Sequence, residues 1–166
     1  MIPEYYKKYI DFSTKGRADI REIFENPKVF SNLIKDMIKL FKDIKFDKVI
    51  GIDALGFVLA SPIALKLKKP LVFVRKEGKL PGLKKDKARI SFIDYQKRKT
   101  MEILKKSINK NERVLIVDEW IETGGQVKAI IGLIESLGGK VAGIGVINAD
   151  KKAKPLFDKY NLRSLI

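Results

Sequence analysis

Two acidic residues stand beside a glycine-containing turn in residues 114–126, VLIVDEWIETGGQ. Asp118 and Glu119 follow the apolar run 114–117, and residues 122–126 read Glu-Thr-Gly-Gly-Gln. Glycines in such a turn let a ligand approach backbone N–H groups, and the N-terminus of a following helix adds positive potential. The order predicts a cradle for a phosphate next to carboxylates that suit the hydroxyls of a sugar. The alternative is an ordinary strand-to-helix turn with a solvated acidic pair.

Two further segments place polar or glycine residues after an apolar strand pattern. Residues 53–56 follow the strand pattern 48–53, KVIGID, and residues 75–82 follow the short apolar run 71–74. Ligands of open parallel sheets bind at the carboxyl ends of the strands. We therefore expect both segments to meet residues 118–126 at one edge of a sheet.

The elements that must position these segments alternate between strand and helix patterns. Asn26 followed by Pro27 is typical of a helix start, and Gly138–Gly139 is typical of a helix end. Short apolar strands separated by amphipathic helices predict an α/β fold with a mainly parallel sheet covered on both faces. The expected strands are 48–53, 71–74, 114–117 and 141–147, and the expected helices are 27–41, 57–68 with a possible kink at Pro62, and one that follows the loop to about residue 137.

Residues 76–99 show almost no periodicity and contain Gly78, Pro81, Gly82 and many charges. A loop of that length in a compact domain is usually an active-site flap or a disordered insert. Residues 90–102 also fit the start of a charged helix.

The composition is that of one globular enzyme-sized domain, residues 1–166, with 45% hydrophobic and 33% charged residues. The chain lacks cysteine and histidine, so acid–base chemistry must fall to Asp, Glu, Lys or Tyr. No apolar run reaches the length of a membrane span, and the first residues are too polar and aromatic for a signal peptide. A cytoplasmic enzyme without membrane contact is the expectation.

The formal charge of +15 favours anionic partners. The lysines are spread along the chain, and no nucleic-acid-binding module is recognisable. A Lys-rich surface of the kind found in thermophiles explains the charge as well. Nucleic acid therefore stays open as a minor alternative.

The segment 114–126 resembles the phosphoribosyl pyrophosphate (PRPP) signature of type I phosphoribosyltransferases. Residues 49–67, VIGIDALGFVLASPIALKL, are similar to the GIEARGF segment of the adenine-type enzymes, and residues 72–82, VFVRKEGKLPG, resemble their VRKxGKLPG segment. Residues 19–30 resemble their N-terminal stretch. The resemblance implies the type I phosphoribosyltransferase fold, a twisted, mainly parallel sheet flanked by helices with a small hood.

The resemblance also implies roles for individual residues. The implied ribose ligands are Asp118 and Glu119, the implied 5′-phosphate ligands are Thr123, Gly124, Gly125 and Gln126, and the implied pyrophosphate ligands are Asp53, Ala54, Leu55, Gly56, Arg75, Lys76 and Lys79. The cofactor implied is Mg²⁺, bound chiefly through PRPP rather than by protein ligands.

Three positions depart from the family pattern. Leu55 stands where adenine-type enzymes have Arg, and Gln126 replaces a Thr or Ser. Glu122 replaces a small residue, but coincides with an Asp that hypoxanthine–guanine enzymes place near purine N7. Glu122 is therefore a candidate acid or base together with the pair 118–119, or else it turns to solvent.

The function implied is a purine phosphoribosyltransferase of salvage, with adenine as the expected base, acting as a homodimer. Base selection would depend on a hood built from residues 1–25 and 148–166, and Trp120 would either stack on ligand or serve the core or a dimer contact. In residues 90–102 the family has a flexible loop, which would act as a lid. The alternatives are a non-catalytic PRPP-sensing regulator that binds nucleic acid, or a transferase for hypoxanthine, guanine, xanthine or a pyrimidine.

Overall fold

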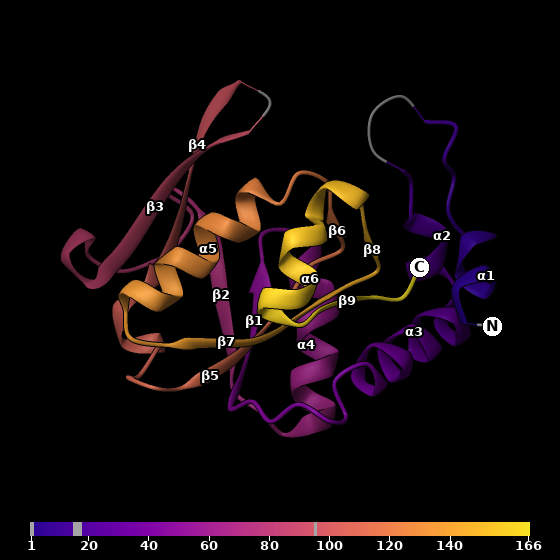
Figure 1. The fold of residues 1–166 in the computed structure, drawn as a ribbon, viewed down its shortest axis with the longest axis horizontal. Helices are drawn as coiled ribbons and strands as arrows, with labels where there is room; N and C mark the ends of the chain where they lie inside the picture. Colours follow the sequence, from indigo (N-terminus) through magenta and orange to yellow (C-terminus); the bar gives the residue numbers. More distant parts are fainter. Residues whose placement is uncertain (1, 15–17, 95) are drawn as a thin grey trace.

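The protein is built around a mainly parallel sheet, seen in a computed structural model that describes residues 2–14, 18–94 and 96–166 (Figure 1). Within these ranges the main sheet has seven strands in the order β3-β4-β2-β1-β5-β7-β9. β4 runs antiparallel to both of its neighbours, and the other pairings are parallel. The strands are β1 (Lys48–Ile52), β2 (Leu71–Lys76), β3 (Lys87–Asp94), β4 (Lys97–Leu104), β5 (Arg113–Val117), β7 (Lys140–Val146) and β9 (Leu162–Ser164).

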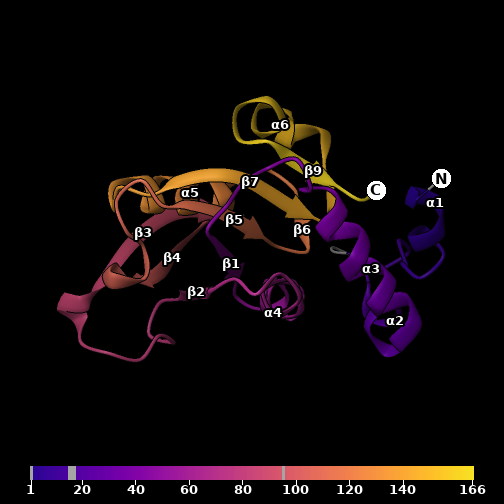
Figure 2. The ribbon, with the colours of Figure 1, turned by 90° about the horizontal axis from the view of Figure 1, so that it is seen from below.

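Helices cover both faces of this sheet. In Figure 2, α5 and α6 lie on one side of the sheet, whereas α3 and α4 lie on the other. A second, two-stranded sheet pairs β6 with β8. The helices are α1 (Ile2–Lys7), α2 (Arg21–Glu25), α3 (Pro27–Lys39), α4 (Leu55–Leu67), α5 (Gly125–Ser136) and α6 (Lys154–Tyr160), the short strands are β6 (Trp120–Ile121) and β8 (Asn148–Ala149), and the 3₁₀ turns are η1 (Lys84–Asp86), η2 (Lys105–Ser107) and η3 (Lys151–Ala153).

The residues of β5 show why both faces of the sheet are covered by helices. Val114 and Ile116 belong to a buried cluster with the apolar residues of α5. Leu115 and Val117 belong to a second cluster with α3 and α4. Side chains alternate between the two faces of a strand, so a continuous apolar run requires a helix layer on each side. The predicted α/β fold is confirmed.

Most element boundaries agree with the sequence-based expectation to within two residues. The Asn26 side chain accepts hydrogen bonds from the N–H groups of Lys28 and Val29, and thus caps α3 as predicted. Gly138 has a φ of +85° just after α5, which is the expected helix end. Pro62 lies inside α4 and does not terminate the helix.

The prediction of a non-periodic segment at residues 76–99 is wrong from Lys87 onward, and so is the helix start within residues 90–102. These residues form most of the β3–β4 hairpin, paired from Lys87 with Leu104 to Asp94 with Lys97. Exposure alternates along β3, where Ile90 packs against the core on one face. The alternation was hidden because charged residues occupy positions on both faces of the hairpin.

The two ends of the chain pack together (Figures 1 and 2). The hydroxyl of the buried Tyr6 in α1 donates a 2.6 Å hydrogen bond to Asp36 of α3. Leu165, near the C-terminus, is buried in the same cluster as Tyr6. None of the helices in the described ranges combines the length and the apolar character needed to cross a bilayer. The division of the chain into a core and a hood stays a prediction.

Two arginine–aspartate pairs join strands of the main sheet to the segment between α3 and β1. Arg113, the first residue of β5, donates side-chain hydrogen bonds of 2.8 and 3.1 Å to Asp47. Arg163 of β9 donates bonds of 2.6 and 2.8 Å to Asp43. The Arg163 guanidinium lowers the pKa of Asp43 to about 2, and the hydrogen bonds from Arg113 hold the pKa of Asp47 well below its usual range.

These pairs predict a loss of stability in acid. A carboxylate whose pKa is depressed by folding stabilises the protein above its unfolded pKa near 4, and this contribution is lost as the pH falls through the folded pKa. We expect the melting temperature to decline between pH 4 and pH 2, with a shallower decline for Asp47→Asn. Thermal denaturation monitored by circular dichroism measures this. Asp86→Asn, at an exposed position of η1, is the control. An unchanged slope for Asp47→Asn would contradict the prediction.

Candidate functional site

The ends of β1 and β5 bring two of the predicted segments together. The strands are parallel neighbours with Gly51 paired to Val117, so the residues that follow emerge at the same edge of the sheet. Asp53 therefore lies near Asp118. Asp118 is nearly buried, and its backbone N–H donates a 3.1 Å hydrogen bond to the carbonyl of Gly145 in β7. The main chain at Asp118 is thus fixed at the edge of the sheet.

Gly56 allows the first turn of α4 to pack against this edge. A Cβ atom at this position would lie 2.8 Å from the carbonyl oxygen of Val117 and 3.0 Å from Oδ1 of Asp118. The first distance is shorter than a Cβ atom tolerates, and the second is a tight contact. Glycine at position 56 therefore sets how closely α4 approaches Asp118.

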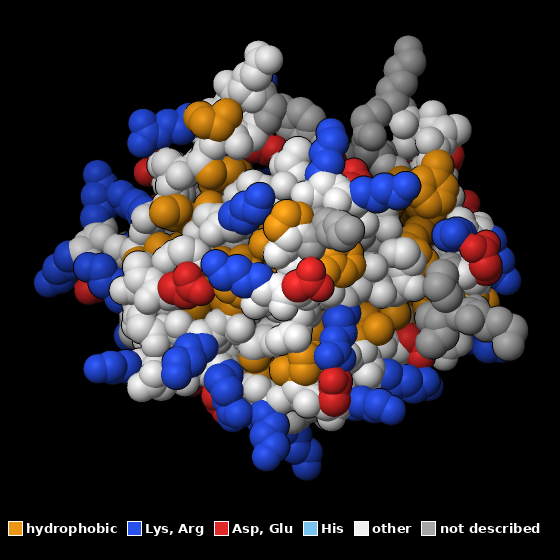
Figure 3. Space-filling view, viewed as in Figure 1, with side chains coloured by type: hydrophobic (Ala, Val, Ile, Leu, Met, Phe, Trp, Pro, Cys, Tyr) orange, Lys and Arg blue, Asp and Glu red, His pale blue; other side chains and the backbone are white. Residues whose placement is uncertain are grey.

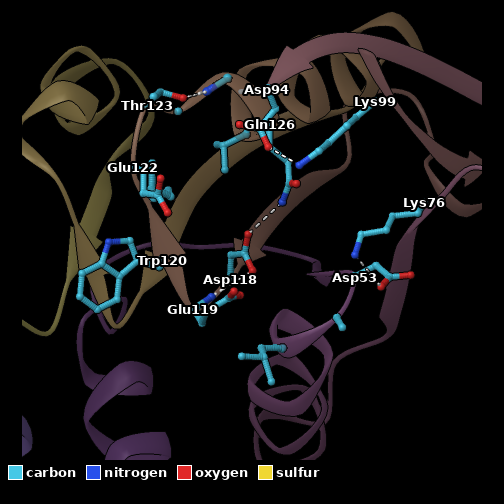
Figure 4. Close-up of a pocket in the computed structure, with 16 residues that line it drawn as sticks. Asp53, Lys76, Asp94, Lys99, Asp118, Glu119, Trp120, Glu122, Thr123 and Gln126 are labelled. Atoms are coloured by element: carbon cyan, nitrogen blue, oxygen red, sulfur yellow. Dashed lines mark hydrogen bonds and ion pairs between the residues drawn. The ribbon is translucent and has the colours of Figure 1, made fainter. Parts of the chain in front are cut away.

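A polar cavity of about 240 Å³ opens where these segments meet (Figure 4). Its walls come from the loop after β1, the segment that follows β5, the first residues of α5 and the β3–β4 hairpin. The residues that line it are Asp53, Ala54, Leu55, Lys76, Asp94, Lys99, Asp118, Glu119, Trp120, Ile121, Glu122, Thr123, Gly124, Gly125, Gln126 and Val127.

The turn at residues 122–125 presents the N-terminus of α5 to the cavity. Gly124 caps the helix with a φ of +77°, a conformation that side-chain-bearing residues rarely adopt. The N–H of Gly125 donates a 3.3 Å hydrogen bond to the hydroxyl of Thr123. Backbone N–H groups at a helix start together with the helix dipole make a site for an anion. The glycine turn before the helix is present as predicted, and its binding of a phosphate stays a prediction.

Gln126 is turned toward the acidic residues. Its Nε2 atom donates a 3.3 Å hydrogen bond to Oδ2 of Asp118 (Figure 4). The N–H of Glu119 donates a 3.0 Å bond to the other oxygen, Oδ1. The amide that replaces the family's hydroxyl therefore orients a carboxylate. The sequence could not reveal this contact, since it depends on the side-chain conformation of Gln126.

A second, less polar cavity of about 450 Å³ adjoins the first. Trp120 forms part of its wall, and the indole N–H donates a 3.1 Å hydrogen bond to Asp150. The ring of Phe12 meets the indole edge-on, with ring centroids 6.2 Å apart. The residues that line this cavity are Phe12, Ala18, Asp19, Ile20, Arg21, Phe24, Leu55, Glu119, Trp120, Glu122 and Asp150.

The second cavity also carries a fixed charge pair. Arg21 donates side-chain and backbone hydrogen bonds to Asp19, which lower the pKa of Asp19 and keep it ionised. The two cavities share Leu55, Glu119, Trp120 and Glu122. Together they can hold an anionic, hydroxylated ligand beside a flat aromatic group.

Eleven of the fourteen residues singled out in the sequence line the first cavity, and three do not. Gly56 lies behind Asp118. The Arg75 side chain turns toward Asp53 at 3.3 Å and donates a 2.9 Å hydrogen bond to the carbonyl of Lys79. Neither Arg75 nor Lys79 borders either cavity, so their role in ligand binding stays a prediction.

Two charged residues of the first cavity were missed. Asp94 and Lys99 form an ion pair within the β3–β4 hairpin. The only available signal was the strand alternation of the hairpin, which was not recognised. Phe12 and Asp150 were located only as parts of the segments 1–25 and 148–166.

The chain is similar to known phosphoribosyltransferases. Residues 19–166 match the family model described as "Phosphoribosyl transferase domain". The adenine phosphoribosyltransferase of Treponema denticola is 37% identical over 147 residues, which are 88% of this chain and 73% of the relative.

Solved structures extend the similarity to the fold. The adenine phosphoribosyltransferase of Thermoanaerobacter pseudethanolicus superposes with a TM-score of 0.88 at 33% identity, covering 99% of this chain and 98% of that one. The Saccharomyces cerevisiae enzyme, in complex with an imino-altritol bisphosphate and adenine, gives 0.85 at 28% identity, with coverage of 99% and 98%.

The packing of Gly56 yields a test of this geometry. Gly56→Ala is expected to lower the free energy of unfolding by about 1–3 kcal/mol, because the new methyl group overlaps the end of β5. Gly125→Ala is the control, since a Cβ there meets nothing nearer than 3.6 Å, and its effect is expected to stay within about 0.5 kcal/mol. Urea denaturation followed by the emission of the single tryptophan measures both. Equal effects would refute the packing argument.

Proposed function

The chain belongs to the phosphoribosyl transferase domain family, and we propose that it transfers the phosphoribosyl group of PRPP to adenine in purine salvage, forming adenosine monophosphate and pyrophosphate. The observation that carries this proposal is the pair of adjoining cavities. One combines a helix N-terminus with carboxylates, and the other is bounded by aromatic rings. A sugar phosphate fits the first, and a planar base fits the second.

The phosphate end of PRPP binds at the start of α5. Backbone N–H groups of residues 123–126 hold the 5′-phosphate, as helix N-termini hold anions elsewhere. Asp118 and Glu119 accept hydrogen bonds from the ribose 2′- and 3′-hydroxyls. The bond from Gln126 to Asp118 keeps that carboxylate in position for the ribose.

The pyrophosphate end binds at the loop after β1. Residues 53–55 and Lys76 border this part of the cavity. Lys76 has its Nζ atom 3.9 Å from Asp53 and is largely exposed, so it can move to a pyrophosphate oxygen. Arg75 and Lys79 reach the ligand only after a change of side-chain conformation.

The base binds in the second cavity, whose wall includes Phe12 and Trp120. The reaction forms a bond between a purine ring nitrogen and C1 of the ribose, breaks the bond from C1 to the pyrophosphate oxygen, and releases the proton of the purine ring. Glu119 and Glu122 line both cavities, and because Glu119 serves the ribose, Glu122 is the carboxylate left to take this proton. Most of the acceleration comes from positioning the two substrates and neutralising the leaving group.

Magnesium is the cofactor that suits these donors. The described residues that line the cavity offer carboxylate oxygens but no histidine or cysteine, and Mg²⁺ binds to oxygen. Asp118 and Glu119 would hold the ion through water, beside the ribose hydroxyls. When bound, the ion offsets the negative charge of pyrophosphate. The absence of cysteine supports an enzyme of the cytoplasm.

The lysines and arginines on one face of the molecule are spread out. Figure 3 shows Lys and Arg side chains scattered over one face of the molecule instead of gathered into a patch. A protein with a formal charge of +15 attracts anions such as PRPP. We therefore favour the metabolic reaction over a nucleic-acid-binding role.

Turnover tests the proposed function. Incubation with PRPP, Mg²⁺ and adenine is expected to yield adenosine monophosphate, with kcat/KM about tenfold or more above that for hypoxanthine, guanine or xanthine. Chromatography of the nucleotide products measures the rates. No nucleotide from any purine or pyrimidine would refute the enzymatic proposal. Binding of PRPP without turnover would favour the sensing alternative.

We also propose that the protein is a homodimer that pairs through α4 and β2. Val58 and Leu65 lie two turns apart on α4 and are 39% and 80% exposed. Phe73 of β2 is 43% exposed and packs against Phe57 of α4 with ring centroids 4.8 Å apart. Large apolar side chains that gather at the surface mark an interaction site.

Charge on this face is expected to separate the subunits. Leu65→Glu places a carboxylate in the proposed interface, which raises the dissociation constant by about a hundredfold or more. Leu83→Glu makes the same change at another exposed leucine outside α4 and is the control. Sedimentation velocity measures the oligomeric state. A wild-type monomer, or equal behaviour of both variants, would refute the proposed dimer.

A further inference from the structure

The pleat of the β3–β4 hairpin aims Lys99 at the candidate site. Alternate residues of a strand share a face, and Met101 and Ile103, which follow Lys99 at this spacing, are buried in the core beside α5. Arg98 has the opposite orientation, and its guanidinium donates a 3.4 Å hydrogen bond to Ser91. Lys99 is therefore held toward α5 by the strand itself.

The hairpin lies directly against the phosphate cradle. The carbonyl oxygen of Ile93 is 3.6 Å from the place where a Cβ on Gly125 would stand. Asp94 and Lys99 border the same cavity as residues 123–126, and Figure 4 shows both beside Gln126. The Asp94 side chain is 15% exposed and makes an ion pair with Lys99. A carboxylate thus sits close to the place that a phosphate would take.

Positive charge is scarce in this cavity. Five carboxylates border it, from Asp53, Asp94, Asp118, Glu119 and Glu122, but only two ammonium groups do so among the described residues, from Lys76 and Lys99. Leu55 supplies no charge at its position on the wall. A multiply charged phosphate ligand needs cations near its oxygens, and a partly enclosed site strengthens each such contact.

We propose that Lys99 binds a phosphate group of the substrate and supplies the positive charge that Leu55 does not, while Asp94 is its partner when the site is empty. This inference rests on the proposed function. In the empty site, the Asp94 carboxylate forms an ion pair with the ammonium group of Lys99. A phosphate group of the ligand competes with Asp94 for this ammonium group and replaces Asp94 in the ion pair.

Two substitutions test the proposal through binding. Lys99→Gln is expected to weaken binding of the ligand whose phosphate it contacts by about ten- to a hundredfold. Asp94→Asn is expected to tighten the same binding by about two- to fivefold, because Lys99 no longer has a competing partner. Arg98→Gln removes one positive charge from the same strand on the opposite face, and is expected to change the affinity less than twofold. Isothermal titration calorimetry measures the dissociation constants.

Two ligands distinguish whether Lys99 binds at the 5′-phosphate position or at the pyrophosphate position. Adenosine monophosphate carries only the 5′-phosphate, whereas inorganic pyrophosphate, titrated with Mg²⁺, carries only the leaving group. A selective loss with one of them in Lys99→Gln assigns Lys99 to that position, and losses with both place Lys99 between the two. Leu55→Lys in the Lys99→Gln background is expected to recover part of the lost pyrophosphate affinity. Melting temperatures of all variants verify folding.

Specific outcomes would overturn the inference. Equal affinities for Lys99→Gln and Arg98→Gln would show that only the overall charge matters. Weaker binding by Asp94→Asn would remove the competing role of Asp94. Both results can occur while the wild-type protein converts adenine to its nucleotide, so they leave the proposed function standing. A wild-type protein that binds neither ligand would overturn both proposals.

Discussion

The parallel pairing of β1 with β5 is the constraint on which the rest of the structure depends. It places Gly51 opposite Val117, so Asp53 and Asp118, which follow the two strands, lie at the same edge of the sheet. Each strand then leads into a helix, α4 or α5, on opposite faces. A shift of this register by one residue would turn the apolar side chains of β5 to the wrong layers. The core that stabilises the fold therefore also places the candidate site.

The candidate site combines rigid and adjustable parts. Asp118 is fixed from several sides, by the backbone of β7, by the close approach of Gly56 and by the Gln126 amide. The two lysines that border the cavity are held differently, since each is paired with an aspartate and remains substantially exposed. Carboxylates that orient a sugar benefit from such rigidity. Lysine ammonium groups that bind a phosphate group benefit from freedom of movement, because they must adjust as the ligand binds and leaves.

The sequence predicted the parts of the fold that depend on local pattern, and missed those that depend on contacts across the chain. The capping of α3 by Asn26 and the turn at Gly124 are local, so residue type alone was sufficient. The β3–β4 hairpin is stabilised partly by charge, as in the bond of 2.9 Å from Arg89 to the buried Glu102. Charged residues at inward positions concealed its strand period. The orientation of Gln126 and the pair formed by Asp94 with Lys99 depend on side-chain conformations, which no spacing rule specifies.

The same hairpin bears on how the molecule behaves in a crowded solution. β3 is the outermost strand at one side of the sheet, and its free edge is a possible template for pairing with another chain. The side chain of Lys87 at the start of this strand is only 8% exposed, and its ammonium group lies 3.6 Å from Glu102. Inward-pointing charges of this kind make a foreign strand costly to add. At the other side β9 has only three residues, which is too short to recruit a partner. The inward-pointing charge that obscures the strand pattern of the hairpin in the sequence thus disfavours edge-to-edge pairing with another chain.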